Sequence, residues 1–248
     1  MIPVYSKPKS LLKNGHKFCP GCLHGVANRI VAEAVDELGI QGSLVGVIAV
    51  GCANISQLYF DFDLIGAAHG RAAAVATGFK RMSPENIVMC YQGDGDLSSI
   101  GFAETIHAAN RGENITVIFI NNCIYGMTGG QMAPTTLVGQ KSTTTVEGRN
   151  PLTEGYPLKM AELISQLEAP RYVARFALNT PTSIAQAKEG VKKALQNQID
   201  GRGYSFVELL SNCPTNWKMT PPETLKFITS SVSKYFVPGV YKDVDGGL

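Results

Sequence analysis

Apolar positions along the chain fall into two alternating kinds of segment. Continuous apolar runs predict strands buried on both faces, and they occupy residues 44–50, 86–91, 115–121, 171–177 and 205–210. Segments with helical spacing lie before and between these runs, at residues 26–38, 70–81, 97–111, 158–167 and 182–198. Because strands alternate with helices, the pattern predicts a mainly parallel sheet with helices on both faces. We therefore expect residues 1–248 to form a single doubly wound α/β domain.

Two further segments lack this periodicity. Residues 126–157 are polar and irregular, and a loop of this length in a compact domain is usually functional. Beyond Cys213, the prolines Pro214, Pro221 and Pro222 interrupt any regular pattern. We expect residues from about 214 to 248 to form a C-terminal arm that wraps around the domain or a partner.

Composition and charge narrow the class of protein. The chain of 248 residues is 44% apolar, yet no apolar run approaches the roughly 20 residues that span a bilayer. The N-terminus has basic residues but no apolar signal core, so we expect a cytoplasmic protein without a membrane partner. Net charge is +2 with Lys and Arg scattered along the chain, which gives no footprint for nucleic acid.

The stretch YQGDGDL holds Asp94 between Gly93 and Gly95, where a strand should pass into a helix. This position favours anions, but Asp94 would repel a bare phosphate. A magnesium ion between Asp94 and a diphosphate resolves the conflict. The next strand ends 28 residues later at Asn122, whose amide oxygen is a neutral metal ligand. The GDG sequence alone would suit an ordinary capped turn, and the second strand end at this spacing favours a metal site.

Six cysteines in a chain without an export signal suggest metal ligands or buried thiols rather than disulfides. Cys19 and Cys22 form a C-x-x-C pair, and the isolated Cys52 and Cys213 could converge with them on one tetrahedral site. Zinc and a [4Fe–4S] cluster both accept four thiolates, so spacing does not choose between them. The other two cysteines, Cys90 and Cys123, lie in or beside apolar strands, where buried inert thiols are expected.

Six motifs occur in order: FCPGC, VGC, HGRAAAVATGFK, YQGDGD, NNCIYGMTGGQMAPTT and SNCPTNW. Together they resemble the thiamine-diphosphate-binding β subunit of 2-oxoacid:ferredoxin oxidoreductases, in the compact branch that acts on 2-oxoisovalerate or 2-oxoglutarate. The resemblance covers nearly the whole chain. One departure is Leu23, where the family often has glycine, so a side chain there could crowd the loop around the cysteines.

The resemblance implies thiamine diphosphate, Mg²⁺ and a [4Fe–4S] cluster as cofactors. Asp94, Asn122 and the carbonyl of Ile124 would bind Mg²⁺. The cluster ligands would be two cysteines of the N-terminal segment 1–25 and two from later in the chain: Cys19, Cys22, Cys52 and Cys213. The implied contacts to thiamine diphosphate are Val50, Gly51, Cys52, Ala53, His69, Gly70, Arg71, Gly93, Gly95, Asp96, Gly126 and Met127. Cluster chemistry also favours iron over zinc, since zinc has no accessible redox state.

The implied reaction is coenzyme A-dependent oxidative decarboxylation of a 2-oxoacid to acyl-CoA and CO₂, with electrons passing to ferredoxin. Thiamine activation needs a carboxylate that a single α/β domain has no second domain to supply. We therefore expect no catalytic residue in this chain, and expect the activating Glu on a partner subunit of α, γ or δ type. The site would then lie at a subunit interface.

Several assignments stay open at this stage. Residues 50–58 contain no Lys or Arg, which favours a branched-chain 2-oxoacid such as 2-oxoisovalerate, with 2-oxoglutarate or pyruvate as alternatives. Ala53, Asn54, Ile55 and Met127 would line its pocket. A non-redox thiamine decarboxylase or synthase subunit, and a zinc-stabilised binding module, are the alternative classes.

Four single side chains carry weaker expectations. His24 is expected to cap a helix rather than to support a cluster sulfur. Arg71 suits a phosphate contact and a solvated helix charge equally. Lys141 and Arg149 could meet coenzyme A or a substrate carboxylate, although charged loop residues are usually only solvated.

Overall fold

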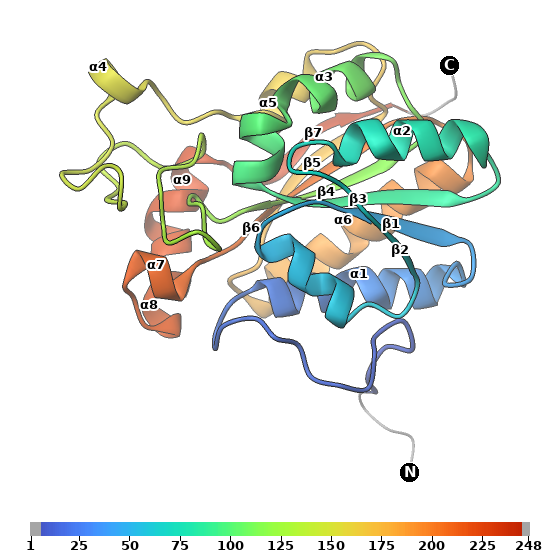
Figure 1. Cartoon of the computed structure of the whole chain (residues 1–248), viewed down its shortest axis with the longest axis horizontal. Helices are drawn as coiled ribbons and strands as arrows, with labels where there is room; N and C mark the ends of the chain where they lie inside the picture. The colour runs from blue at the N-terminus through green and yellow to red at the C-terminus, as the bar shows by residue number, and fades with distance from the viewer. Residues whose placement is uncertain (1–5, 245–248) are drawn as a thin grey trace.

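The computed structural model describes residues 6–244, which form one seven-stranded sheet in the order β2-β1-β3-β4-β6-β5-β7 (Figure 1). The strands are β1 (Leu44–Ile48), β2 (Asp63–Gly66), β3 (Ile87–Gly93), β4 (Thr116–Asn121), β5 (Tyr172–Ala177), β6 (Ser205–Leu210) and β7 (Gly239–Asp243). Every neighbouring pair is parallel except β5 and β7, which are antiparallel. The predicted α/β fold with a mainly parallel sheet is confirmed.

Helices cover both faces of the sheet, as Figure 1 shows. One face carries α1 (His24–Leu38) and α6 (Pro181–Ile199), and the other carries α2 (Ala72–Met82), α3 (Phe102–Asn110) and α5 (Met160–Ser165). Adjacent strand residues point to opposite layers, so Met89 belongs to the core under α1 and Val88 to the core under α2. This double burial explains the continuous apolar runs of the central strands.

The predicted helix over residues 97–111 is divided. A π-helical turn (Asp96–Ile100) comes first, and α3 begins only at Phe102. The division lies where the backbone of Gly101 packs against Gly70, since a Cβ at Gly70 would lie 2.7 Å from the Gly101 nitrogen. Such π-helical turns are frequent at functional sites.

The C-terminal arm packs against its own domain. It contains α7 (Pro214–Trp217), α8 (Pro221–Phe227), a π-helical turn (Ile228–Val232) and α9 (Ser233–Tyr235), and it ends in β7. Phe236 is fully buried in the core on the α1 side, and β7 pairs with β5 at the sheet edge. The arm also carries Cys213 at its root, at the carboxyl end of β6.

The long segment over residues 126–157 projects from one end of the sheet and contains only the short helix α4 (Pro151–Glu154) (Figure 1). A 3₁₀ helix (Cys52–Leu58) follows β1 at the same end. The carboxyl ends of β1, β3, β4 and β6 meet there, which is where ligands bind in sheets of this kind. None of the helices within residues 6–244 has the length and apolar character needed to cross a membrane.

Candidate functional site

A pocket opens at the carboxyl ends of β1, β3 and β4, with about 470 Å³ of empty space including its mouth. Its walls contain most of the residues expected to hold thiamine diphosphate and Mg²⁺: Val50, Gly51, Cys52, Ala53, His69, Gly93, Asp94, Gly95, Asp96, Asn122, Ile124, Gly126 and Met127. His24, Tyr125 and Thr128 complete the lining and were not among the expected residues. The strand ends thus bring together side chains that are far apart in sequence.

The carboxylate of Asp94 is held by three hydrogen bonds. One carboxylate oxygen accepts hydrogen bonds from the Thr135 hydroxyl at 2.6 Å and the Ile124 amide at 3.3 Å, and the other accepts one from the Gly95 amide at 2.9 Å. Burial raises the pKa of Asp94 to about 6, although these hydrogen bonds oppose the rise. A cation bound to the carboxylate would stabilise its charged form.

The other expected magnesium ligands lie in the turn after β4. The Asn122 side-chain oxygen accepts a hydrogen bond from the Ile124 amide at 3.2 Å, which fixes the amide group in the pocket wall. The Ile124 amide also bonds to Asp94, so the two oxygen ligands share one donor. A carboxylate, an amide oxygen and a backbone carbonyl are the hard donors that Mg²⁺ prefers, and the residues present fit that ion.

Asp96 lines the pocket, and its carboxylate is hydrogen-bonded within the protein. One of its carboxylate oxygens accepts from the Gly70 amide and bonds to the His69 ring, both at 2.6 Å, and the other accepts from Gln92 at 2.5 Å. Its oxygens are therefore engaged within the protein. Asp96 holds the loop before α2, and with it orients His69, whose second ring nitrogen is left for other contacts.

Arg71 does not line the pocket. Its guanidinium pairs with Glu104 at 2.6 Å and donates to the Ile100 carbonyl at 3.0 Å. Its side chain is 44% exposed. Of the two interpretations left open from the sequence, this geometry matches a surface helix charge. Gly70 also lies outside the lining residues and contributes its amide to Asp96.

Two glycines of the pocket have steric roles. A Cβ on Gly95 would lie 2.3 Å from the Tyr125 ring, so the absence of a side chain lets this ring close over the turn. A Cβ on Gly126 would lie 3.2 Å from the Cys52 sulfur and 3.6 Å from the Cys213 sulfur. Gly126 therefore stands between the pocket and the cysteines.

The four predicted cluster cysteines, Cys19, Cys22, Cys52 and Cys213, all line a second cavity of about 700 Å³, open to solvent. Burial raises the pKa of Cys22 and of Cys52 to about 12, and the other cysteines add to the rise. Within residues 6–244, no three His, Cys, Asp or Glu side chains are close enough together to hold one metal ion. Four thiols around a cavity larger than one ion fit a [4Fe–4S] cluster, in which each cysteine sulfur binds a different iron.

The remaining cysteines lie in the core. Cys90 and Cys123 are fully buried, and burial raises the pKa of both thiols. Leu23, which could have crowded the cysteine loop, instead packs into the core on the α1 side and does not line the cysteine cavity.

The expected role of His24 as a helix cap is wrong. His24 is the first residue of α1, and its ring bonds to the Tyr91 hydroxyl at 2.9 Å and stacks on Phe18. It is 1% exposed, and burial lowers its pKa to about 4, so the ring is neutral near pH 7. His24 lines both cavities, and no local sequence signal separates this position from a cap.

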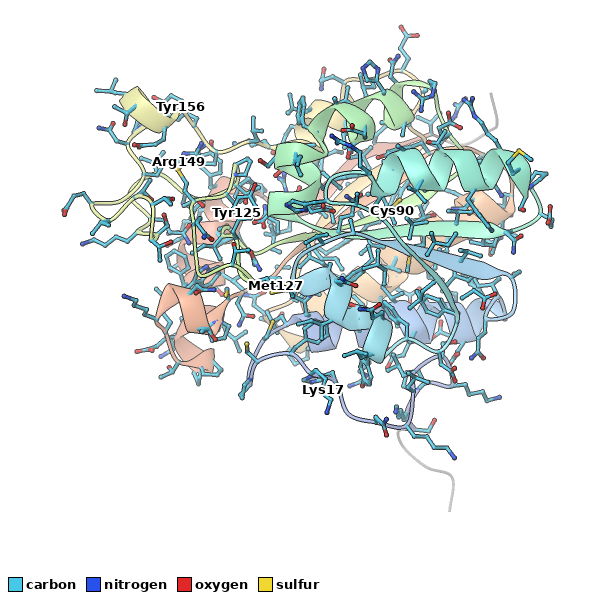
Figure 2. All side chains as sticks on the ribbon, in the orientation of Figure 1. Lys17, Cys90, Tyr125, Met127, Arg149 and Tyr156 are labelled. Atoms are coloured by element: carbon cyan, nitrogen blue, oxygen red, sulfur yellow. The ribbon has the colours of Figure 1, made fainter. Side chains whose placement is uncertain are left out.

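Arg149 proves to be structural. It is 5% exposed and donates to backbone carbonyls on both sides of the projecting segment, including Pro134 at 2.9 Å, Thr136 at 2.7 Å and Tyr156 at 2.9 Å. Figure 2 shows Arg149 inside this segment, away from Met127 at the pocket. Residues 126–157 have little regular secondary structure, and the hydrogen bonds of Arg149 hold their backbone in place. The guanidinium of Arg149 is therefore already engaged and is not available to a ligand.

Comparison with known proteins agrees with this site. Residues 49–209 match the family model described as "Thiamine pyrophosphate enzyme, C-terminal TPP binding domain". The match spans the strand ends that carry Asp94 and Asn122. The chain therefore belongs to the thiamine pyrophosphate enzymes and carries their cofactor-binding domain.

Within that family the chain falls in the branch of the 2-oxoacid:ferredoxin oxidoreductase β subunits. It is 49% identical to the ketoisovalerate oxidoreductase subunit VorA of Methanothermobacter marburgensis, over 91% of this chain and 47% of that protein. It is 36% identical to the 2-oxoglutarate synthase subunit KorB of Methanocaldococcus jannaschii, over 86% of this chain and 77% of that protein. The chain spans about half the length of the VorA relative.

A solved structure has the same fold. The 2-oxoglutarate:ferredoxin oxidoreductase from Magnetococcus marinus, with 2-oxoglutarate, coenzyme A and succinyl-CoA bound, aligns with a TM-score of 0.81 at 26% identity. The alignment covers 97% of this chain and 86% of that one.

Proposed function

We propose that this chain is the thiamine diphosphate- and [4Fe–4S]-binding subunit of a 2-oxoacid:ferredoxin oxidoreductase. The reaction is the oxidative decarboxylation of a 2-oxoacid with coenzyme A, which yields acyl-CoA, CO₂ and two reducing equivalents for ferredoxin. One observation carries the proposal: the pocket with Asp94 and the cysteine cavity share a wall. The shared residues are His24, Cys52, Asn122, Gly126 and Met127.

In this proposal Asp94, Asn122 and the Ile124 carbonyl hold Mg²⁺, which in turn holds the diphosphate at Gly93 and Gly95. His69, fixed by Asp96 through the 2.6 Å bond, faces the same diphosphate. The four cysteines hold the cluster. When bound, thiamine diphosphate supplies the carbon nucleophile for decarboxylation, and the cluster accepts electrons one at a time.

This chain's own residues then position, shield and connect the two cofactors. Tyr125 packs over Gly95, and His24 with Tyr91 closes the back of the pocket with a neutral, fully buried pair. Gly126 keeps the wall between the pocket and the cysteines thin, because any side chain there would contact the sulfur of Cys52. A thin wall supports electron transfer from the pocket to the cluster.

We propose a branched-chain substrate such as 2-oxoisovalerate. Within the part of the chain that the structure describes, no Lys or Arg lines the pocket, whose apolar side chains include Val50, Ala53 and Met127. A second substrate carboxylate buried here would lack a partner, whereas each buried CH₂ stabilises binding by roughly 0.8 kcal/mol. The higher identity to a subunit named for ketoisovalerate agrees with this choice. Of the four residues expected to line the substrate pocket, Ala53 and Met127 do so. Ile55 lines the cysteine cavity instead, and Asn54 lines neither cavity.

The activating carboxylate must reach the pocket through its open mouth, from a partner subunit. Of the residues that the structure describes, no Glu lines the pocket, and the two acids that do, Asp94 and Asp96, are hydrogen-bonded within the protein.

The test is an anaerobic absorbance spectrum of the assembled complex, together with iron, sulfide and thiamine assays. We expect about four irons and four sulfides per copy of this chain, as a [4Fe–4S] cluster requires. Comparison of kcat/KM for 2-oxoisovalerate, pyruvate and 2-oxoglutarate then tests the substrate. A clear preference for 2-oxoglutarate would show that a cation outside this chain's pocket sets specificity.

Two outcomes would contradict the proposed class. A colourless, oxygen-stable protein that binds thiamine diphosphate would be a non-redox decarboxylase or synthase subunit. A protein that contains zinc with neither iron nor thiamine would be a zinc-stabilised module.

A further inference from the structure

The two segments that carry three of the four predicted cluster cysteines have many basic residues and almost no acidic ones. Residues 6–32 and 209–242 contain nine of the 22 Lys and Arg residues but only one of the 20 Asp and Glu residues, Glu223. These basic residues are Lys7, Lys9, Lys13, Lys17, Arg29, Lys218, Lys226, Lys234 and Lys242. The rest of the chain is correspondingly acidic, so the net charge of +2 conceals a strong asymmetry.

The fold joins these two segments beside the cysteine cavity. Asn212 accepts from the Leu23 amide at 2.9 Å and donates to the Gly21 carbonyl at 3.1 Å, which ties the C-x-x-C loop to the root of the arm. Gly21 lies against Pro221 at the start of α8, since a Cβ there would lie 2.3 Å from the proline ring. The loop with Cys19 and the arm with Cys213 therefore form one continuous surface.

Three lysines of the two segments are exposed. Lys17 stands two residues before Cys19, Lys218 follows α7, and Lys226 lies in the last turn of α8. Figure 2 shows Lys17 pointing away from the domain. The single acid, Glu223, accepts from the Thr220 amide and hydroxyl, each at 2.7 Å, as part of a capping box. The carboxylate of Glu223 is therefore bonded at the N-terminus of α8.

Cys19 is itself exposed, so the cysteine cavity reaches the protein surface within this basic region. An electron carrier must approach that point closely, because electron transfer weakens steeply with distance. Complexes of electron carriers have small interfaces, below about 1,200 Å², and in such encounters charge complementarity sets the rate of association. A basic surface around a redox centre therefore selects an acidic carrier.

We infer that Lys17, Lys218 and Lys226 form the docking surface for an acidic one-electron carrier protein, which receives electrons beside Cys19. This inference rests on the proposed function, and it names the surface and the charge of the partner. The same lysines steer the carrier to the cysteine loop and away from the acidic remainder of the chain.

The experiment measures reduction of two acceptors by the assembled complex: a purified acidic [4Fe–4S] ferredoxin, and methyl viologen, which has no protein surface. Lys17→Glu, Lys218→Glu and Lys226→Glu are each expected to raise the KM for ferredoxin about threefold to tenfold, as loss of steering charge does. The triple variant should raise it further. The maximal rate of methyl viologen reduction, measured with saturating viologen at high salt so that its own positive charge is screened, should not change, because the interior of the site is untouched.

Lys9→Glu is the matched control, since Lys9 is an exposed lysine of the same N-terminal segment whose amide bonds to Asp36 on the last turns of α1.

The KM of the wild type for ferredoxin should rise as ionic strength increases from about 20 to about 300 mM, over which the Debye length falls from about 20 to about 6 Å. The triple variant should lose most of this salt dependence. An equal effect of Lys9→Glu, or a triple variant with wild-type KM and salt dependence, would overturn the docking surface.

Direct binding separates failure of this inference from failure of the proposed function. Titration of ferredoxin against the complex, without turnover, should show weaker binding of the triple variant at low salt. If wild type binds ferredoxin through these lysines but reduces no acceptor, the docking surface stands and the proposed reaction fails. If single-stranded RNA binds the same lysines as tightly as ferredoxin does, the surface is a general polyanion site and the inference is overturned.

Discussion

At the scale of single residues, the candidate site depends on charges that the fold buries before any ligand is bound. Asp94 receives three hydrogen bonds that orient its carboxylate, yet burial still raises its pKa. The hydrogen bonds therefore do not offset the cost of the buried charge. A carboxylate held in this way suits a cation, which would supply the remaining stabilisation when bound.

The first prediction concerns this carboxylate. Asp94→Asn keeps the size of the side chain but removes its charge, so Mg²⁺-dependent binding of thiamine diphosphate should be lost. Calorimetric titration with thiamine diphosphate and Mg²⁺ measures the loss directly. In wild type, cofactor at 100 times its Kd should stabilise the chain by about 2.7 kcal/mol, and this increment should be absent in the variant. A variant with the wild-type increment would contradict the assignment of Asp94 as a metal ligand.

The cysteines provide the second prediction. Cys19→Ser, Cys22→Ser, Cys52→Ser and Cys213→Ser should each reduce iron content and stop ferredoxin reduction, because the thiolate is the cluster ligand. Iron per folded chain, measured after anaerobic purification, is the readout. Cys90→Ser is the control, since Cys90 is buried in the sheet away from the cysteine cavity. Iron loss in Cys90→Ser as severe as in Cys52→Ser would show that the ligand set is wrong.

At the scale of elements, charged side chains connect α1 and α6, two helices on the same face of the sheet. Glu37 near the end of α1 accepts from Lys188 and Lys192 of α6, each at 2.7 Å. These bonds lower the pKa of Glu37. The three side chains are partly exposed, so their contribution to stability is small and sensitive to salt.

The third prediction tests this link through pH. Because the folded-state pKa of Glu37 is lowered, its stabilising effect is present above the pKa of the unfolded chain and is lost as pH falls through the folded pKa. Wild type should therefore lose slightly more stability than Glu37→Gln between pH 6 and pH 3, by about 0.5 kcal/mol. Urea unfolding at each pH gives the comparison, and the difference should vanish at high salt. Parallel pH profiles at low salt would contradict the coupling.

A buried network joins β5 to its neighbours. Arg175 is fully buried and pairs with Glu208 of β6 at 2.9 Å and with Glu162 of α5 at 2.6 Å, and it donates to the Tyr241 hydroxyl of β7 at 2.6 Å. Burial opposes its charge, but Glu208 and Glu162 outweigh burial and raise the pKa of Arg175. One side chain thus holds a strand, a helix and the end of the C-terminal arm.

The fourth prediction follows from that network. Arg175→Met should reduce the free energy of unfolding by about 3–5 kcal/mol, because Glu208 is left as a buried charge without its partner. The double variant Arg175→Met with Glu208→Gln should recover part of this loss, since the uncompensated charge is gone. Urea unfolding of all three proteins tests the expectation. Equal stability of the single and double variants would show that Glu208 does not depend on Arg175.

The elements that the sequence predicted and those it missed differ in burial. The central strands and the long helices have strong patterns because both faces, or one full face, are buried. Strands β2 and β7 were missed because they are short edge strands with exposed and half-buried positions. The break after Ile100 was missed because it depends on the contact between Gly70 and Gly101, which is invisible in local periodicity.

The same reasoning applies to the candidate site. Asp94 and Asn122 could be predicted because each follows a recognisable strand in a parallel sheet. Thr135, which donates to Asp94 across 41 positions of sequence, lies in a segment without periodicity. The contact of His24 with Tyr91 joins a helix start to a strand, and only the folded chain reveals it.

At the scale of the whole molecule, the proposed thiamine site and the proposed cluster site occupy two adjoining cavities. The thiamine pocket opens between the ends of β1, β3 and β4, whereas the cysteine cavity lies between the N-terminal segment and the root of the arm. Among residues 6–244, the pocket is lined by Asp94 and Asn122 but by no Glu that could activate thiamine. This arrangement favours a site completed by a second polypeptide.

The last prediction tests that completion. The chain expressed alone and loaded with thiamine diphosphate, Mg²⁺ and cluster should not oxidise any 2-oxoacid, because the activating carboxylate lies elsewhere. It should still bind the cofactors, since their ligands are within residues 19–213. Addition of the partner subunits should restore acyl-CoA formation and ferredoxin reduction together, whereas complexes assembled with the Asp94→Asn variant should remain inactive. Turnover of the isolated wild-type chain is measured as CO₂ release with methyl viologen as acceptor. Steady-state turnover in this assay would show that the chain contains its own activating group, and the prediction of an active site shared between subunits would be wrong.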